Sequence, residues 1–234
     1  MDLFELAVAN KLAGGGGGGG HDVEDGIIQR TITSYFNSTA SLLGVYAFMG
    51  CYSLSTIEMT SATNLSNSVF TSCSALTTAS FPNAKSIGYY AFSGCKSLTS
   101  VYLPIASAIG QSAFYYCITL PSIELPAAKN IEKAAFGYCS ALSLVSLGKS
   151  TISHNTVFFY QSVFYNCKGL KSVYILSNAV ATLSNADAFY NTPMQYSSYL
   201  GYFGSIYVPA SLVDSYKAST NWSVYKDRIT SYVE

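Results

Sequence analysis

The six cysteines carry the most reactive side chains of this 234-residue sequence, and they recur at regular intervals. They are Cys51, Cys73, Cys95, Cys117, Cys139 and Cys167, so the first four steps are 22 residues each and the fifth is 28. Thiols can pair as disulfides, ligate a metal or lie buried as small apolar groups. A zinc site needs ligands within a few residues of one another, and this series has one cysteine per interval.

The other residues with catalytic chemistry are few. The two histidines are His21, beside the glycine run 14–20, and His154. The sequence contains no HExxH, GxSxG or Walker motif, and the glycine run lacks the strand and the Gly-Lys-Ser/Thr of a phosphate loop. We therefore expect no catalytic residue, no metal and no cofactor, and an enzyme with an unrecognised site is the least favoured reading.

The charge of the chain is low and balanced. Charged residues make up 10% of the sequence, with twelve acids and twelve bases. Because no basic cluster is present, we expect no nucleic-acid partner. No apolar stretch approaches the roughly 20 residues of a membrane span, so no membrane insertion is expected. The start MDLFELAVANKLA lacks the basic and apolar regions of a signal peptide.

Each cysteine belongs to a repeated unit in which a phenylalanine stands three residues before it. The phenylalanines are Phe48, Phe70, Phe92, Phe114, Phe136 and Phe164, and a seventh unit has Phe189 with Thr192 in place of cysteine. A unit of 22 residues is too small to bury its own apolar face, so neighbouring units must stack and share a core. The repeat predicts a solenoid whose core contains these six phenylalanines and all six cysteines.

One short strand is expected in each unit. In AFSGCKSLTSVYLP, Val101 and Leu103 point inward while Ser100 and Tyr102 point outward, and Pro104 ends the strand. Strands of successive coils then form a parallel sheet with a spacing of about 4.8 Å. Equivalent cysteines of such a stack point in parallel directions, which favours buried free thiols over disulfides between coils.

The pattern Ala-Phe-x-x-Cys-x-x-Leu-x-x-Val-x-Leu-Pro over about residues 40–209 resembles the BspA-like class of bacterial leucine-rich repeats. The resemblance implies a right-handed leucine-rich-repeat solenoid with a parallel β-sheet on one face and irregular or short helical segments on the other. It also implies a surface-exposed or adhesive role, at the cell surface or outside the cell, and no catalytic residues.

Composition divides the chain into four parts. Residues 1–13 form a short helix or tail, residues 14–26 a glycine-rich linker, residues 27–209 a solenoid of about seven repeats, and residues 210–234 a helical cap. Ser211 to Asp214 resembles a capping box after Pro209. Trp222 and Tyr225 are expected to seal the last coil, because the final apolar face needs a cover. The alternative for Trp222 is stacking against a ligand.

Two groups of residues are candidates for an interaction surface. The first is the outward position next to the inner strand residue of each unit, and its members are Glu58, Ser80, Tyr102, Glu124, Ser146, Tyr174 and Tyr207. The second is formed by aromatic residues in the longer intervals, Phe158, Phe159 and Tyr202. Tyrosine offers a flat area with a polar group at low entropic cost. An ordinary hydrated sheet face, and aromatic residues that only cover the solenoid end, are the alternatives.

Two function classes remain ahead of an enzyme. The first is a non-enzymatic, adhesin-like module that binds an unknown protein or carbohydrate. The second is a structural, tail-associated component of a bacterial virus or other large assembly, attached through the N-terminal helix and glycine run.

Overall fold

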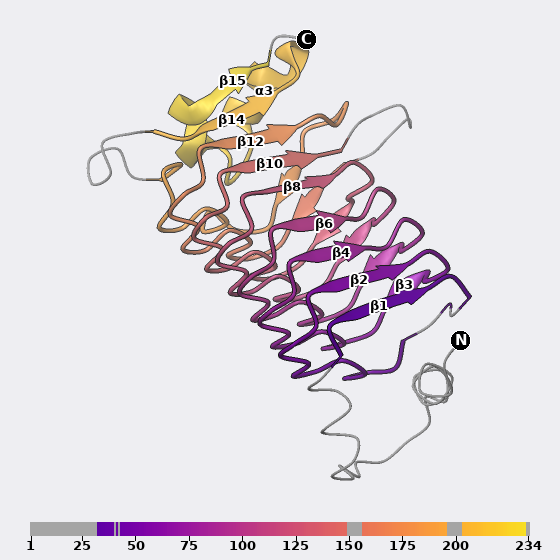
Figure 1. Cartoon of the computed structure of the whole chain (residues 1–234). Coiled ribbons are helices and arrows are strands. Elements are labelled where there is room, and N and C mark those ends of the chain that lie inside the picture. Colours follow the sequence, from indigo (N-terminus) through magenta and orange to yellow (C-terminus); the bar gives the residue numbers. More distant parts are fainter. Residues whose placement is uncertain (1–31, 40, 42, 149–155, 196–202, 233–234) are drawn as a thin grey trace.

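A computed structural model describes residues 32–39, 41, 43–148, 156–195 and 203–232. The described chain winds into stacked coils that run from β1 at one end to the cap at the other (Figure 1). Each regular coil contributes one strand to each of two rows of parallel strands. The predicted helix of residues 1–13 and the linker of residues 14–26 lie outside the described residues.

The first row carries the longer strands, of three or four residues. Four of them form one parallel sheet, and they are β1 (Ser34–Asn37), β2 (Thr56–Met59), β4 (Thr78–Ser80) and β6 (Ser100–Tyr102). Five more form a second sheet along the same face, and they are β8 (Ser122–Leu125), β10 (Leu144–Leu147), β12 (Ser172–Ile175), β14 (Ser205–Val208) and β15 (Ile229–Ser231). The predicted strands are thus present in this row.

The second row consists of two-residue strands joined in one six-stranded parallel sheet. They are β3 (Asn64–Leu65), β5 (Ser86–Ile87), β7 (Ala108–Ile109), β9 (Asn130–Ile131), β11 (Phe158–Phe159) and β13 (Thr182–Leu183). The resemblance to leucine-rich repeats implied irregular or short helical segments on this face. A strand of two residues has only one inward side chain, so the sequence shows no alternation of inward and outward residues there. These short strands could therefore not be recognised from the sequence.

A tight corner joins β3-type strands to the next long strand, and it contains the phenylalanine and the cysteine. Within a coil the Cys73 amide donates to the Phe70 carbonyl over 3.1 Å, and the Phe70 amide donates to Ala91 of the next coil over 2.8 Å. The residue before the cysteine has a positive φ, for example Ser72 (63°) and Gly94 (75°). The corner is therefore held by bonds both within and between coils.

The predicted core residues are all buried. Each of the six phenylalanines and six cysteines is at most 2% exposed. The rings of Phe92, Phe114 and Phe136 stack with centroids 5.1 and 5.2 Å apart and interplanar angles of 7° and 6°. Offset stacks at this separation add to the gain from burial. The aromatic column and its flanking aliphatic rows form one continuous core.

The cysteines are free thiols that bond to the neighbouring coil. The Cys95 Sγ donates to the Phe70 carbonyl over 3.2 Å, and Cys117 Sγ donates in the same way to Phe92. Burial raises the pKa of the Cys95 thiol above its ordinary value, which withholds the reactive thiolate. The prediction of unpaired, buried thiols agrees with this arrangement.

The C-terminal cap combines helices and a strand. Its helical segments are the 3₁₀ helix η1 (Ala210–Leu212), the α-helix α3 (Val213–Ala218) and the 3₁₀ helix η2 (Ser223–Arg228). Tyr216, Trp222 and Tyr225 are at most 1% exposed beneath them. The expected helical cap is thus present, and β15 adds a strand of the first row to it.

The expected capping box is not formed. Helix α3 begins at Val213 after Leu212, and no side chain bonds to its first turn. Pro209 fixes the entry to η1 instead, and Ser211 lies inside that 3₁₀ helix. Within the described part of the chain, no helix has the length and apolar character needed to cross a bilayer.

Candidate interaction surface

The seven outward residues of the first group form a row across the long strands, which we call the strand row. Parallel pairing places Glu58 beside Ser80 and Ser80 beside Tyr102. It also joins the remaining four in the order Glu124, Ser146, Tyr174 and Tyr207. Since the ladders fix the spacing of neighbouring strands, the side chains of the row are presented in a fixed order.

Exposure varies along the strand row. Tyr102 is 56% exposed, and Glu58 and Glu124 are exposed as well. Tyr174 and Tyr207 are half-buried because their rings stack on each other, with centroids 4.5 Å apart and an interplanar angle of 10°. The row therefore presents a single projecting tyrosine near its middle and a paired aromatic surface near the cap.

The long strands carry acidic but no basic residues. Their sequences contain the two carboxylates Glu58 and Glu124 and no lysine or arginine. Beside the strand row runs a second outward row of hydroxyl groups that includes Thr78, Ser100 and Ser122. This face is thus hydroxyl-rich with a weak negative charge.

The predicted contribution of the aromatic intervals changes with the structure. Phe159 is fully buried, because it occupies the inward position of β11 beside Ile131 and Leu183. Its assignment to an interaction surface was wrong. Phe158 is half-buried and belongs to the second row of strands, away from the strand row, and Tyr202 lies outside the described residues.

A group of surface tyrosines was missed from the sequence. On the phenylalanine-cysteine corners, five tyrosines of neighbouring coils contact one another, and we call them the tyrosine ladder: Tyr115, Tyr116, Tyr138, Tyr165 and Tyr190. Tyr116 and Tyr138 stack with centroids 4.7 Å apart. The signal was present in the units FYYC, FGYC and FYNC, where tyrosines flank the core positions.

Two members of the tyrosine ladder occupy the left-handed corner position. Tyr116 has a φ of 61° and Tyr138 a φ of 62°, where other coils place Gly50 and Gly94. A bulky residue in this conformation costs about 1–2 kcal/mol, and ring stacking offsets part of that cost. The stacked rings turn their faces toward each other along the solenoid, so mainly ring edges and hydroxyl groups remain for contact.

Two phenols of the tyrosine ladder, those of Tyr115 and Tyr165, have a raised pKa. Partial burial, followed by the neighbouring phenols Tyr138 and Tyr116, raises the pKa of Tyr115. A hydrogen bond with Tyr138 raises the pKa of Tyr165. These groups can donate hydrogen bonds to a partner but do not supply a phenolate nucleophile.

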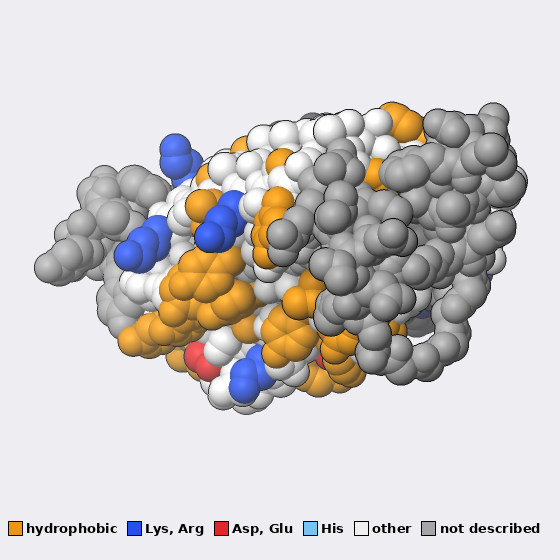
Figure 2. Space-filling view, turned by 60° about the horizontal axis from the view of Figure 1, so that its bottom comes forward, with side chains coloured by type: hydrophobic (Ala, Val, Ile, Leu, Met, Phe, Trp, Pro, Cys, Tyr) orange, Lys and Arg blue, Asp and Glu red, His pale blue; other side chains and the backbone are white. Residues whose placement is uncertain are grey.

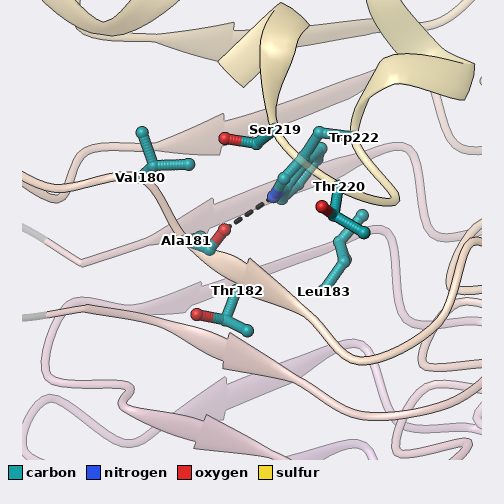
Figure 3. Close-up of a pocket in the computed structure, with 7 residues that line it drawn as sticks. All are labelled: Val180, Ala181, Thr182, Leu183, Ser219, Thr220 and Trp222. Atoms are coloured by element: carbon teal, nitrogen blue, oxygen red, sulfur yellow. Dashed lines mark hydrogen bonds between the residues drawn. The ribbon is translucent and has the colours of Figure 1, made fainter. Parts of the chain in front are cut away.

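A hollow of about 300 Å³ lies where the cap meets the last coil. Figure 3 shows Ser219, Thr220 and Trp222 of the cap facing the β13 strand and the residues before it. The Trp222 Nε1 donates to the Ala181 carbonyl over 2.6 Å. Because Trp222 is only 1% exposed, it fills the joint rather than offering a ring to a ligand.

Figure 2 shows a face on which hydrophobic side chains, a class that includes tyrosine, gather, with single charged side chains around them. Among the described residues, no group of three or more His, Cys, Asp or Glu could hold a metal ion. The arrangement therefore offers aromatic and hydroxyl contacts rather than a charged or metal-binding centre.

The repeats match a known sequence family. The BspA type leucine rich repeat region matches in six copies, over residues 30–143 and 85–207. The chain belongs to this family. Its members are repeat proteins, and solenoids of stacked repeats present extended surfaces for interaction. The resemblance seen in the sequence is thus confirmed, and the chain is a leucine-rich repeat interaction module. No curated protein matches it.

The chain is also similar to solved structures of bacterial proteins. The T. pallidum leucine-rich repeat protein TpLRR is 31% identical with a TM-score of 0.50, over 59% of this chain and 64% of that one. A leucine-rich repeat protein from Bacteroides ovatus is 25% identical with a TM-score of 0.43, over 76% and 56%. The pneumococcal vaccine antigen PcpA is 14% identical with a TM-score of 0.47, over 84% and 65%. The chain spans less than two thirds of each of these proteins.

Proposed function

We propose that this chain is a non-enzymatic, adhesin-like binding module at the bacterial cell surface, and that it binds a protein or carbohydrate partner through the strand row. The family supports an interaction role, and the strand row supplies a suitable surface. The proposal assigns no catalytic residue, metal or cofactor to the chain. Attachment to a larger assembly would depend on residues 1–26, outside the described chain.

The observation that carries the proposal is the projection of Tyr102 from a hydrogen-bonded ladder. The Tyr102 ring is 56% exposed, whereas Ala79, the inward residue of the paired strand β4, is buried. A side chain on a rigid strand loses little entropy on binding, so more of the contact energy appears as affinity. Tyr174 and Tyr207 add a second aromatic contact on the same face.

A double variant tests the surface. We expect Tyr102→Ser with Tyr174→Ser to weaken binding of a partner found by glycan array or pull-down at least tenfold. The matched control is Tyr116→Ser with Tyr138→Ser, which removes two tyrosines from the tyrosine ladder. Both variants should keep the circular dichroism spectrum of the parent, because none of the four side chains belongs to the buried core.

The outcomes separate the two faces. Loss of binding in the strand-row variant alone supports the proposal. If the tyrosine-ladder variant loses binding while the strand-row variant keeps it, recognition lies on the corners and the proposal is wrong.

A further inference from the structure

The long-strand face is interrupted at one place in the middle of the solenoid. Strands β6 and β8 come from consecutive coils, yet they belong to separate sheets. The second row continues without a break through the same two coils, where β7 pairs with β5 and β9. The second row of strands is thus continuous through these two coils, and the interruption is confined to the long-strand face.

Pro121 explains the interruption. In neighbouring coils the residue before the strand donates its amide to the preceding coil: Thr99 donates to Thr77 over 2.9 Å, and Ser143 donates to Pro121 over 2.9 Å. Pro121 holds the equivalent place in the intervening coil and has no amide hydrogen to give to the Thr99 carbonyl. The ladder between β6 and β8 therefore lacks one bond that the neighbouring coils make.

A further bond of the ladder is missing at the opening. Ser100 donates to Thr77 over 3.1 Å, but no corresponding bond joins Ser122 to the Thr99 carbonyl in the described chain. The Thr119 hydroxyl donates instead to the carbonyls of Lys96 and Leu98, over 2.8 and 3.0 Å. Within the described part of the chain, the Thr99 carbonyl therefore accepts no backbone hydrogen bond from the next coil.

A cleft of about 220 Å³ occupies the opening, and we call it the β6–β8 cleft. It is lined on one side by residues 99–104 and on the other by Ser122, Glu124 and Pro126. Val101 lies at its floor and is partly exposed, whereas the equivalent residues Ala79 and Ile123 are buried. The exposure of an inward position agrees with a real opening of the sheet.

The chemistry of the β6–β8 cleft favours a cation. The residues that line it include Glu124, which supplies a carboxylate, the hydroxyl residues Thr99, Ser100 and Ser122, and the aromatic residue Tyr102. Carboxylates and carbonyls accept from an ammonium or guanidinium group, and a tyrosine ring attracts it through its π face. No lysine or arginine lines the cleft to compete for these acceptors.

We propose that the β6–β8 cleft is a subsite for one arginine or lysine side chain of a protein partner. The proposal rests on the proposed function, since it assigns a protein as the partner of the strand row. Glu124 forms the ion pair, the Thr99 carbonyl accepts a hydrogen bond, and Tyr102 covers the cationic group. The alkyl part of the side chain lies against Val101.

Amide hydrogen exchange tests whether the cleft exists. The amides of Ser122 and Leu103 should exchange at least tenfold faster than those of Ser100 and Phe81, which bond to neighbouring coils. Pro121→Thr introduces the residue that the preceding coil has at this place, Thr99, and with it an amide hydrogen. The variant should therefore slow exchange at Ser122 and raise the melting temperature. Equal protection of Ser122 and Ser100 in the parent protein would overturn the inference.

Nuclear magnetic resonance titrations test the ligand. Nα-acetyl-arginine amide should shift the resonances of Leu103, Ser122 and Glu124, and Nα-acetyl-citrulline amide, which lacks the charge, should not. Glu124→Gln should weaken the arginine probe roughly tenfold, and Pro121→Thr should abolish its binding. Glu58→Gln is the matched control, because Glu58 belongs to the strand row but does not line the cleft.

The results distinguish this subsite from the proposed function. The arginine subsite would be overturned if the citrulline probe bound as tightly as the arginine probe, or if methyl hexosides bound and the arginine probe did not. It would also be overturned if Pro121→Thr left binding of the arginine probe unchanged. A subsite that behaves as expected, with a partner that is indifferent to the Tyr102 and Tyr174 double variant, would overturn the proposed function alone.

Discussion

At the scale of single residues, the stacked phenylalanines are among the largest fully buried side chains of the core. Phe92 has no exposed surface and stacks between Phe70 and Phe114. We expect Phe92→Ala to lower the free energy of unfolding by about 3–5 kcal/mol, through lost burial and the cavity left behind. Urea denaturation followed by circular dichroism measures this change.

The control for this change is Ile105→Ala at a position 39% exposed, which should cost no more than about 0.5 kcal/mol. Amide exchange should show that Phe92→Ala accelerates opening mainly in adjacent coils, because each repeat contacts only its neighbours. Uniform acceleration along the whole solenoid would contradict that expectation.

The cysteines allow a second test at the same scale. Burial raises the pKa of Cys117 and Cys167 well above the ordinary value, and both are fully buried. Since the thiolate is the reactive form, we expect no labelling by a thiol reagent in the native protein and six labelled thiols in denaturant. Rapid labelling of several cysteines in the native protein, or a disulfide between coils, would contradict the prediction of buried, unpaired thiols.

At the scale of elements, the cap depends on two buried phenols. Burial raises the pKa of Tyr225 to about 12, and burial also raises the pKa of Tyr216. An unfolded tyrosine has a pKa near 10. The folded cap holds the proton more tightly, so this stabilisation is complete below about pH 10 and is lost as pH rises toward about 12.

Raising the pH from 9 to 12 should therefore open the cap before the central coils. The fluorescence of Trp222, which contacts both Tyr216 and Tyr225, reports the opening. Tyr225→Phe removes one ionising group and should shift the transition to higher pH, although it also loses the bond to the Ala186 carbonyl. An unchanged alkaline midpoint in this variant would contradict the explanation.

At the scale of the whole molecule, the solenoid should tolerate the loss of one full coil. Deletion of residues 78–99 joins Thr77 to Ser100, and Ser100 is the registered partner of Thr78. The inward and outward alternation of the following strand is then preserved, so β2 can pair with β6. We expect a folded, cooperatively melting protein with a spectrum typical of β-sheet.

A deletion one residue shorter provides the contrast. Removal of residues 78–98 joins Thr77 to Thr99, which turns Ser100 inward and Val101 outward at the junction. A slip of one residue exchanges the two faces of a strand. This variant should be less stable than the full-coil deletion in thermal denaturation, and equal stability would contradict a core set by the repeat phase.

The sequence by itself determined the period, the strands of the first row and the identity of the core. Phe48 to Phe164, the cysteines and Val101-type positions recur at a fixed offset, and a repeat that cannot bury its own apolar face must stack. The inward direction of the strand positions follows from local alternation, which is visible in one coil. For the same reason Tyr102 could be placed outward before the fold was known.

The tertiary structure decided how side chains of different coils meet. Phe159 looked like part of an aromatic loop, but pairing of β11 with β9 and β13 turns it inward. The contacts of Tyr116 with Tyr138 depend on the left-handed corners that bring the two coils into line. Pro121 marks a missing donor in the sequence, yet only the stacking of consecutive coils shows that the lost bond opens the face beside Tyr102. These features depend on relations between coils, which a local pattern of inward and outward residues does not contain.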